Sequence, residues 1–285
     1  MPVTQSPGLL LLGFFREPQA LAILNSLCVC PDSRRQALKA ICLQARTTRG
    51  GAVARAGVPE ILEIPPQLKA YTDQVAALDR LKGGVAGLPF EPKMVEIGRL
   101  MAIQAGVFVD RVAEIEATLG AAPDARGLAE VCLPLDGRLD INDVSLDTAT
   151  LPMKVVSRNP NVSVLGWAAA IQDPATGLLP MLFLVGQREP CIQVIEFGGR
   201  YYLRNGYHRA VAAMRVGVTH MPALVTHGTS WASVHEQLGQ GWLFDARVLG
   251  EQMPTLSHFE LGYKLPLRMW EYDLEFSLKT VQRRI

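Results

Sequence analysis

The chain has 285 residues, of which 49% are hydrophobic and 19% are charged, and its formal net charge is +1. A chain of this length can bury one large core or two moderate ones. The nearly neutral charge excludes recognition of a polyanion by bulk electrostatics, so that any anion site must be local. The apolar run from Leu9 to Phe15 is too short to cross a bilayer and lacks the flanks of a signal peptide. We therefore expect a cytoplasmic protein with no membrane association.

Cysteine usage argues against a disulfide framework and against a metal centre. The five cysteines are an odd number in a long chain. Cys28 and Cys30 form the one close pair, but a single residue separates them and no second pair or histidine stands nearby. Metal-binding pairs usually have two to four residues between them. We predict no metal site and assign these thiols to apolar helix packing.

The first 120 residues are predicted to form a mostly helical domain of unknown role. Apolar spacing predicts a helix that begins at Glu17, and cap residues after Pro31 predict a second one over about 33–46. A third helix, over about 66–82, starts at a proline pair and is ended by Gly83 and Gly84. The basic residues of 33–59 have no aromatic side chains between them, so a solvated face is favoured over nucleic-acid binding.

The strongest helical pattern follows Pro92. Apolar residues recur there at intervals of three, four and seven positions: Met94, Ile97, Met101, Phe108, Val112, Ile115 and Leu119. One stripe of this kind predicts a single helix over 92–119. The stripe fits a helix that packs on the core, and it also fits a seam through which two copies self-associate as a homodimer. Both interpretations stay open.

Strand patterns dominate after a connection over 121–150. Two apolar runs flank the turn residues 173–177, and two more flank Gly198 and Gly199, which is the spacing of a tight hairpin. A short helix from Tyr207 to Val216, a strand at 221–227 and an alternating strand at 270–278 complete the pattern. We therefore expect an α+β protein with a helical domain over 1–120 and a mixed α/β domain over 151–285.

A candidate anion site lies where the hairpin meets the short helix, in the residues Arg204, Asn205, Gly206, Tyr207, His208 and Arg209. The first amides of a helix lack internal partners and lie at the positive end of its dipole. Gly206 permits a sharp turn, and Arg209 offers a forked, permanently charged donor. His208 donates one hydrogen bond when neutral and two when charged. These features predict a phosphate pocket, with Arg200 or Arg204 at its rim.

The local charge agrees with this prediction. No aspartate or glutamate occurs from Phe197 to His235, whereas that span holds four arginines and four histidines. A basic zone in a nearly neutral chain suits a phosphate site. The alternative is that acids from elsewhere pair with these arginines and that His208 only caps a helix.

The block from Ile192 to Val225 resembles the ParB/sulfiredoxin-like superfamily, a nucleotide-binding fold. There a strand, a tight turn and a second strand lead into Gly-x-His-Arg, followed by a helix, a glycine and a strand introduced by proline. Gly206, His208, Arg209, Gly217 and Pro222 stand at the matching positions. The clear resemblance covers about residues 190–225. It implies that His208, Arg209 and the first helix amides hold the phosphates of a nucleotide, with ATP or CTP and Mg²⁺ as the implied ligands.

Two departures narrow what the resemblance implies. Tyr207 stands where sulfiredoxins carry their catalytic cysteine, which excludes sulfinic acid reduction by that route. Asn205 stands where the free-serine kinase branch has an aspartate, and an amide cannot replace a carboxylate as a base or a Mg²⁺ ligand. Too little chain follows the motif for the DNA-binding domain of ParB proteins, so nucleic-acid binding of that type is not expected.

The sequence favours a protein that binds a nucleotide or another phosphate ligand and acts as a switch or an assembly factor. The first alternative is a phosphotransferase or NTPase that uses the same pocket, for which Glu196 is the near acid. The second alternative is a structural or interaction protein in which the site is vestigial.

Overall fold

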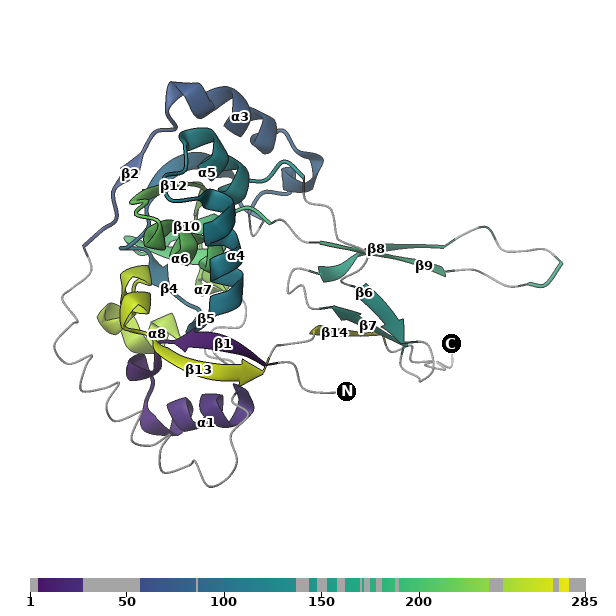
Figure 1. Cartoon of the computed structure of the whole chain (residues 1–285). Helices are drawn as coiled ribbons and strands as arrows, with labels where there is room; N and C mark the ends of the chain where they lie inside the picture. The colour runs from purple at the N-terminus through teal and green to yellow at the C-terminus, as the bar shows by residue number, and fades with distance from the viewer. Residues whose placement is uncertain are drawn as a thin grey trace. The chain divides into compact units, whose positions relative to one another are not determined.

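A computed structural model describes residues 5–27, 57–85, 87–136, 144–147, 153–157, 162–169, 171, 175–177, 181–187, 190–235, 243–268 and 272–276. It confirms the α+β class (Figure 1). The predictions for Cys28, Cys30 and the helix over 33–46 fall outside these ranges. The chain divides into two compact units: unit 1 joins Met1–Leu135 to Cys191–Arg268, and unit 2 joins Asp136–Pro190 to Met269–Ile285.

Two sheets belong to unit 1. A mixed six-stranded sheet has the order β2 (Ile61–Leu62), β3 (Phe90–Glu96), β12 (His220–His227), β10 (Gln193–Phe197), β11 (Arg200–Asn205) and β4 (Met101–Ala102). An antiparallel three-stranded sheet has the order β13 (Tyr263–Arg268), β1 (Gln5–Leu10) and β5 (Gly106–Phe108). Both sheets combine strands from the two ends of the chain. This arrangement differs from the separate helical domain expected over 1–120, because strands from that segment pair with strands that follow residue 190.

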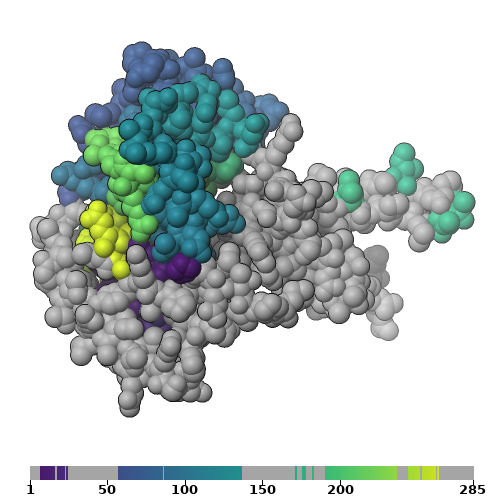
Figure 2. All heavy atoms as spheres, viewed as in Figure 1, coloured from purple at the N-terminus to yellow at the C-terminus, as the bar shows by residue number. Residues whose placement is uncertain are grey.

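The helices of unit 1 cover the sheets and close the core. They are α1 (Glu17–Leu27), α3 (Pro66–Ala76), α4 (Val109–Leu119), α5 (Ala125–Cys132), α6 (Tyr207–Arg215), α7 (Trp231–Val234) and α8 (Ala246–Leu249). In the folded unit α5 contacts β12, α3 contacts β3, and α4 contacts both α6 and β1. Figure 2 shows the blue and teal atoms of residues 57–136 beside the green atoms of residues 190–235 on one face. The two sequence segments therefore form one surface as well as one core.

Unit 2 contains a three-stranded antiparallel sheet, β14 (Tyr272–Phe276), β7 (Met153–Ser157) and β6 (Val144–Asp147), and a separate hairpin, β8 (Val162–Ala169) with β9 (Met181–Gln187). The hairpin confirms the two strands predicted on either side of residues 173–177. β14 lies inside the strand predicted over 270–278.

The prediction of a single helix over 92–119 is wrong. Residues 90–108 form β3, β4 and β5, and only Val109–Leu119 is helical. Met94 and Met101 are strand residues, and Ile97 lies in the turn between β3 and β4. Self-association through a continuous helix of that length is therefore not available. Where α4 does form, its apolar stripe is used inside unit 1, since Val112 is fully buried against the core.

A core role for α4 can be separated from a dimer seam by mutation. We expect Val112→Ala to lower the free energy of unfolding by about 2 kcal/mol, because it leaves a cavity in a closed core. The measurement is urea unfolding at several protein concentrations, with the exposed Glu114→Ala as the control, for which a change within about 0.5 kcal/mol is expected. A midpoint that rises with protein concentration in the wild type, and no longer does so in Val112→Ala, would contradict the core assignment.

Candidate functional site

The Asn205–Arg209 corner, defined as residues 205–209, joins β11 to α6 as the sequence predicts. Gly206 caps α6 with φ at 100°, in the left-handed region. A Cβ at this position would lie 2.7 Å from Cγ1 of Ile192 and 3.4 Å from Nη2 of Arg209. Both the positive φ and the lack of space require glycine here. The missing side chain lets Ile192, the residue before β10, and the Arg209 guanidinium approach the start of the helix closely.

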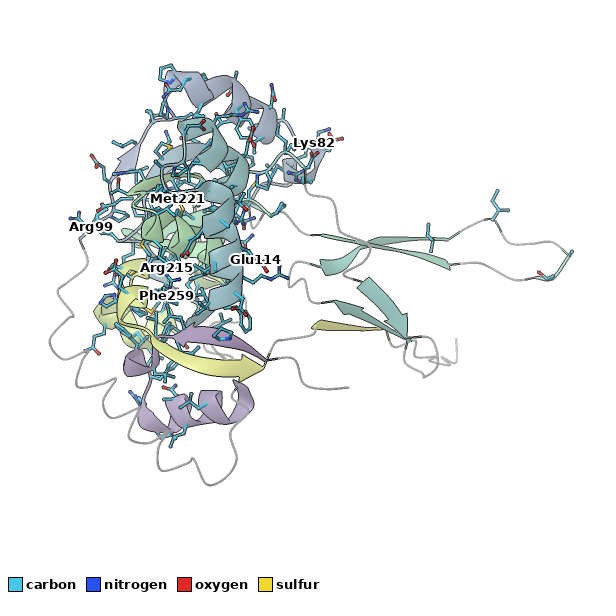
Figure 3. All side chains as sticks on the ribbon, in the orientation of Figure 1. Lys82, Arg99, Glu114, Arg215, Met221 and Phe259 are labelled. Atoms are coloured by element: carbon cyan, nitrogen blue, oxygen red, sulfur yellow. The ribbon has the colours of Figure 1, made fainter. Side chains whose placement is uncertain are left out.

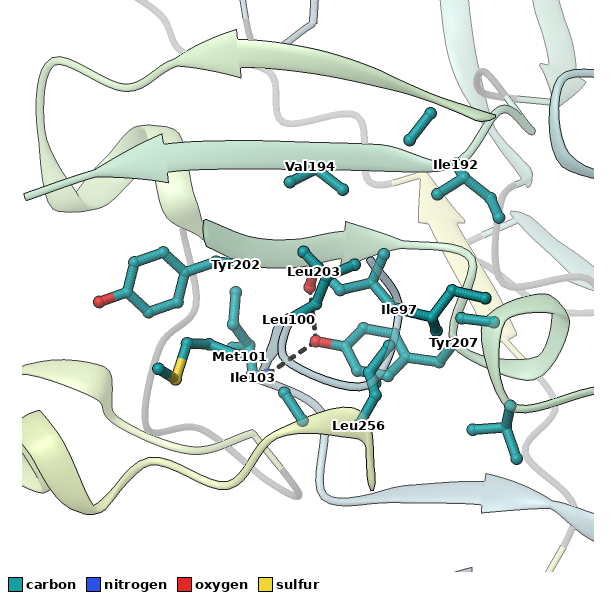
Figure 4. Close-up of a cluster of buried hydrophobic side chains, with 14 of the residues drawn as sticks. Ile97, Leu100, Met101, Ile103, Ile192, Val194, Tyr202, Leu203, Tyr207 and Leu256 are labelled. Atoms are coloured by element: carbon teal, nitrogen blue, oxygen red, sulfur yellow. Dashed lines mark hydrogen bonds between the residues drawn. The ribbon is translucent and has the colours of Figure 1, made fainter. Parts of the chain in front are cut away.

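Tyr207 fixes the corner from inside the core. Its hydroxyl accepts hydrogen bonds from the backbone amides of Ile103 and Gln104, at 2.7 and 3.1 Å, and donates to the carbonyl of Leu203 at 2.5 Å. Figure 4 shows the ring among buried side chains, with the hydroxyl between Ile103 and Leu203. Burial raises the pKa of Tyr207 far above its usual range. At the position of a sulfiredoxin nucleophile, this chain thus carries a neutral phenol that joins two segments of the core.

His208 is held in one tautomer. Its Nε2 accepts the backbone N–H of Phe108 at 3.0 Å, and its ring is parallel to the Phe108 ring at 6.1 Å. Burial, reinforced by the charges of Arg111 and Arg209, lowers the pKa of His208 to about 4. Because Nε2 is an acceptor in a neutral ring, the proton is on Nδ1. No residue in the described ranges accepts a hydrogen bond from that Nδ1–H.

Arg209 connects the start of α6 to the end of α5. Its Nη1 donates to the carbonyls of Val131 and Cys132, both at 3.2 Å. These are the last carbonyls of α5, which lack partners within the helix and lie at the negative end of its dipole. The guanidinium therefore lies between the negative end of one helix and the positive end of another, with Nη2 beside Gly206.

The remaining predicted residues spread along β11. Asn205 Nδ2 donates to the carbonyl of Cys191 at 3.2 Å, on the strand side of the corner. Arg204 donates to Ser233 in α7 at 3.1 Å, and Arg200 donates to the carbonyl of Gly250. Five residues of extended strand, roughly 17 Å, separate Arg200 from Asn205. The structure brings Asn205, Gly206, Tyr207, His208 and Arg209 together and places Arg200 at the other end of the strand.

Part of the basic zone is neutralised by acids from other segments. Arg215, labelled in Figure 3, meets Glu116 of α4 at 3.3 Å. His227 meets Glu196 at 3.1 Å, and Glu196 also accepts the Gly199 amide at 2.9 Å. In the β10–β11 ladder Asn205 pairs with Gln193, whereas Glu196 pairs with Tyr201 toward the hairpin turn. Glu196 is therefore directed to the hairpin end of the ladder and not to the corner.

Several partners of the corner could not have been found by sequence reasoning. The backbone groups of Ile103, Phe108, Val131 and Cys191 act through carbonyls and amides that every residue possesses. The signal that could have been read is Gly106, which interrupts the supposed helix just before Phe108.

The described ranges contain no group of three or more His, Cys, Asp or Glu side chains arranged to hold a metal ion. Within the same ranges, no helix is long and apolar enough to span a bilayer. No protein-family model, curated protein or solved structure matches the chain.

Removal of the Tyr207 hydroxyl should destabilise the protein without changing its fold. Tyr207→Phe leaves two buried amides and one carbonyl without their partner, and we expect a loss of about 3 kcal/mol in the free energy of unfolding. The matched control is Tyr201→Phe in β11. The Tyr201 ring is only half-buried, so a small effect is expected. Equal losses in the two variants, measured by urea unfolding, would show that the Tyr207 hydroxyl has no special role.

The His208 tautomer predicts a pH dependence of stability. The folded pKa of about 4 lies below the ordinary value of 6.5, so the unfolded chain binds more protons between these values. The contribution of His208 to stability is therefore fully present above about pH 6.5 and is lost as the pH falls toward 4, by about 3 kcal/mol in total. Urea unfolding from pH 7 to pH 4 should show a shallower loss in His208→Gln than in the wild type. A loss as steep in His208→Gln as in the wild type would contradict this assignment.

Proposed function

We propose that this chain binds a nucleotide or another phosphate ligand at the start of α6, and that binding serves as a switch or assembly signal. The observation that carries the proposal is the position of the Arg209 guanidinium, whose Nη2 lies beside Gly206 at a helix start with no side-chain cap. Uncapped first-turn amides and a forked cation at one helix N-terminus are the donors that phosphate oxygens require.

The neutral His208 adds a directed donor to this proposal. Its Nε2 is occupied by the Phe108 amide, which fixes the ring and leaves the Nδ1–H as the donor. A neutral imidazole contributes a hydrogen bond to an anion but no charge, so charge neutralisation falls to Arg209 and the helix dipole. Tyr207 and Asn205 then shape the corner: the phenol anchors it to the core, and the amide holds it to Cys191.

The phosphotransferase alternative has less support. It depends on a carboxylate near the transferred group. Glu196 is bound to His227 and to the Gly199 amide near the hairpin turn, so it does not serve this corner. We therefore propose binding, with ATP or CTP and Mg²⁺ as the first ligands to test, without proposing catalysis.

A structural or interaction protein remains the second candidate, and one observation favours it. The Tyr207 hydroxyl and the Arg209 Nη1 both satisfy backbone groups of the chain itself. A corner used in this way could hold the fold together with no ligand at all.

Thermal unfolding with ligands decides between the two. We expect ATP, ADP, CTP or GTP, with or without Mg²⁺, to stabilise the wild type by about 2.7 kcal/mol at 100 times its Kd. Arg209→Ala should lose this increment, because it removes the cation at the helix start. Arg215→Ala, in the last turn of the same helix and paired with Glu116, should retain it.

The proposal fails if none of these nucleotides shifts the wild-type midpoint at millimolar concentration. It also fails if Arg209→Ala and Arg215→Ala show the same shift as the wild type. Either result would favour the structural candidate.

A further inference from the structure

The chain leaves unit 1 after Leu135 and returns to it at Cys191. We call residues 131–135 and 191–192, all of them in unit 1, the stem. The two limbs of the stem are joined directly, since the Ile192 amide donates to the Cys132 carbonyl at 2.9 Å. Interactions that stabilise the stem therefore fix the two points at which the segment 136–190 joins unit 1.

Side chains hold both limbs of the stem through their carbonyls. On the departing limb, Arg209 donates to the carbonyls of Val131 and Cys132. The Tyr71 hydroxyl donates to the Leu133 carbonyl at 2.8 Å, and Arg80 donates to the carbonyls of Pro134 and Leu135 at 2.6 and 2.8 Å. On the returning limb, Asn205 donates to the Cys191 carbonyl. These side-chain bonds can be exchanged without breaking a strand ladder, whereas the Ile192 carbonyl also accepts the backbone amide of Leu224 in β12 at 2.9 Å.

The corner contributes to both limbs. Asn205 and Arg209 flank Gly206 at the start of α6, and each reaches a different limb of the stem. Arg209, which is proposed to receive a phosphate, is thus also one of the side chains that fix the stem. A charged phosphate oxygen is a stronger acceptor for a guanidinium than a neutral peptide carbonyl.

We infer that phosphate binding at the corner competes with the carbonyls of Val131 and Cys132 for Arg209 and so loosens the stem at the base of residues 136–190. The inference rests on the proposed function and adds its regulation. Because binding and stem opening share one side chain, the coupling is reciprocal: a partner that holds the stem closed weakens phosphate binding by the same factor.

Amide hydrogen exchange on the full chain, read by mass spectrometry in peptides that cover 131–135 and 191–193, tests the inference in two arms. In the first arm no ligand is present. We expect Arg209→Ala to speed exchange of the Ile192 amide about tenfold or more, as for one lost charge-assisted hydrogen bond, and Asn205→Ala to speed it about two- to tenfold, as for one lost neutral hydrogen bond. Arg215→Ala should leave that amide unchanged, and Arg209→Lys, which retains the charge, serves if Arg209→Ala does not fold.

Unchanged exchange at Ile192 in Asn205→Ala and in the Arg209 variants overturns the inference whatever ATP does. This outcome says nothing against phosphate binding, so it separates the regulation from the proposed function.

In the second arm the wild type is measured with ATP, and with inorganic phosphate as the simplest probe of the same chemistry. The expected result is faster exchange at Ile192 together with a higher melting temperature. A higher melting temperature with unchanged or slower exchange overturns the competition and leaves the proposed function standing. No change in either quantity overturns both.

Discussion

The start of α6 depends on the absence of one side chain, since no Cβ fits between Gly206, Ile192 and Arg209. That close approach allows three consecutive side chains to reach three different segments. Tyr207 reaches the turn after β4, His208 reaches the start of α4, and Arg209 reaches the end of α5. These bonds satisfy backbone groups in partly or fully buried places, where an unmade hydrogen bond is costly. The corner thereby joins the segment before residue 135 to the segment after residue 190, and both sheets of unit 1 rely on that union.

Among the described residues, two helix ends surround the guanidinium of Arg209. The end of α5 and the start of α6 present opposite partial charges to one guanidinium. Arg215, at the far end of α6, instead pairs with a carboxylate of α4. The described partners of Arg209, at the start of α6, are therefore carbonyls, and the described partner of Arg215, at its end, is an acid.

Elements with local signals were predicted from the sequence, and elements defined by distant partners were not. Gly198 and Gly199 both adopt positive φ, as a two-residue hairpin requires, and β10, β11, α6 and β12 follow in the predicted order. The helix predicted over 92–119 failed because the run from Leu100 to Phe108 is apolar at every position except Gln104, so helical spacing can be found in it by chance. The role of the corner residues as a ligand site stays a prediction. Their bonding was not predictable, because their partners are peptide groups of residues a hundred positions away.

The pairing of strands from both ends of the chain also has a consequence during synthesis. β3 meets β12 with Glu96 opposite His220, and β1 meets β13 with Gln5 opposite Arg268. At roughly 5–20 residues per second, the ribosome delivers β12 on the order of ten seconds after β3. Until then the nascent chain carries strands whose edges and apolar side chains have no partner, which is the condition that favours aggregation. The strand order of unit 1 thus sets an interval of synthesis during which extended apolar segments are exposed.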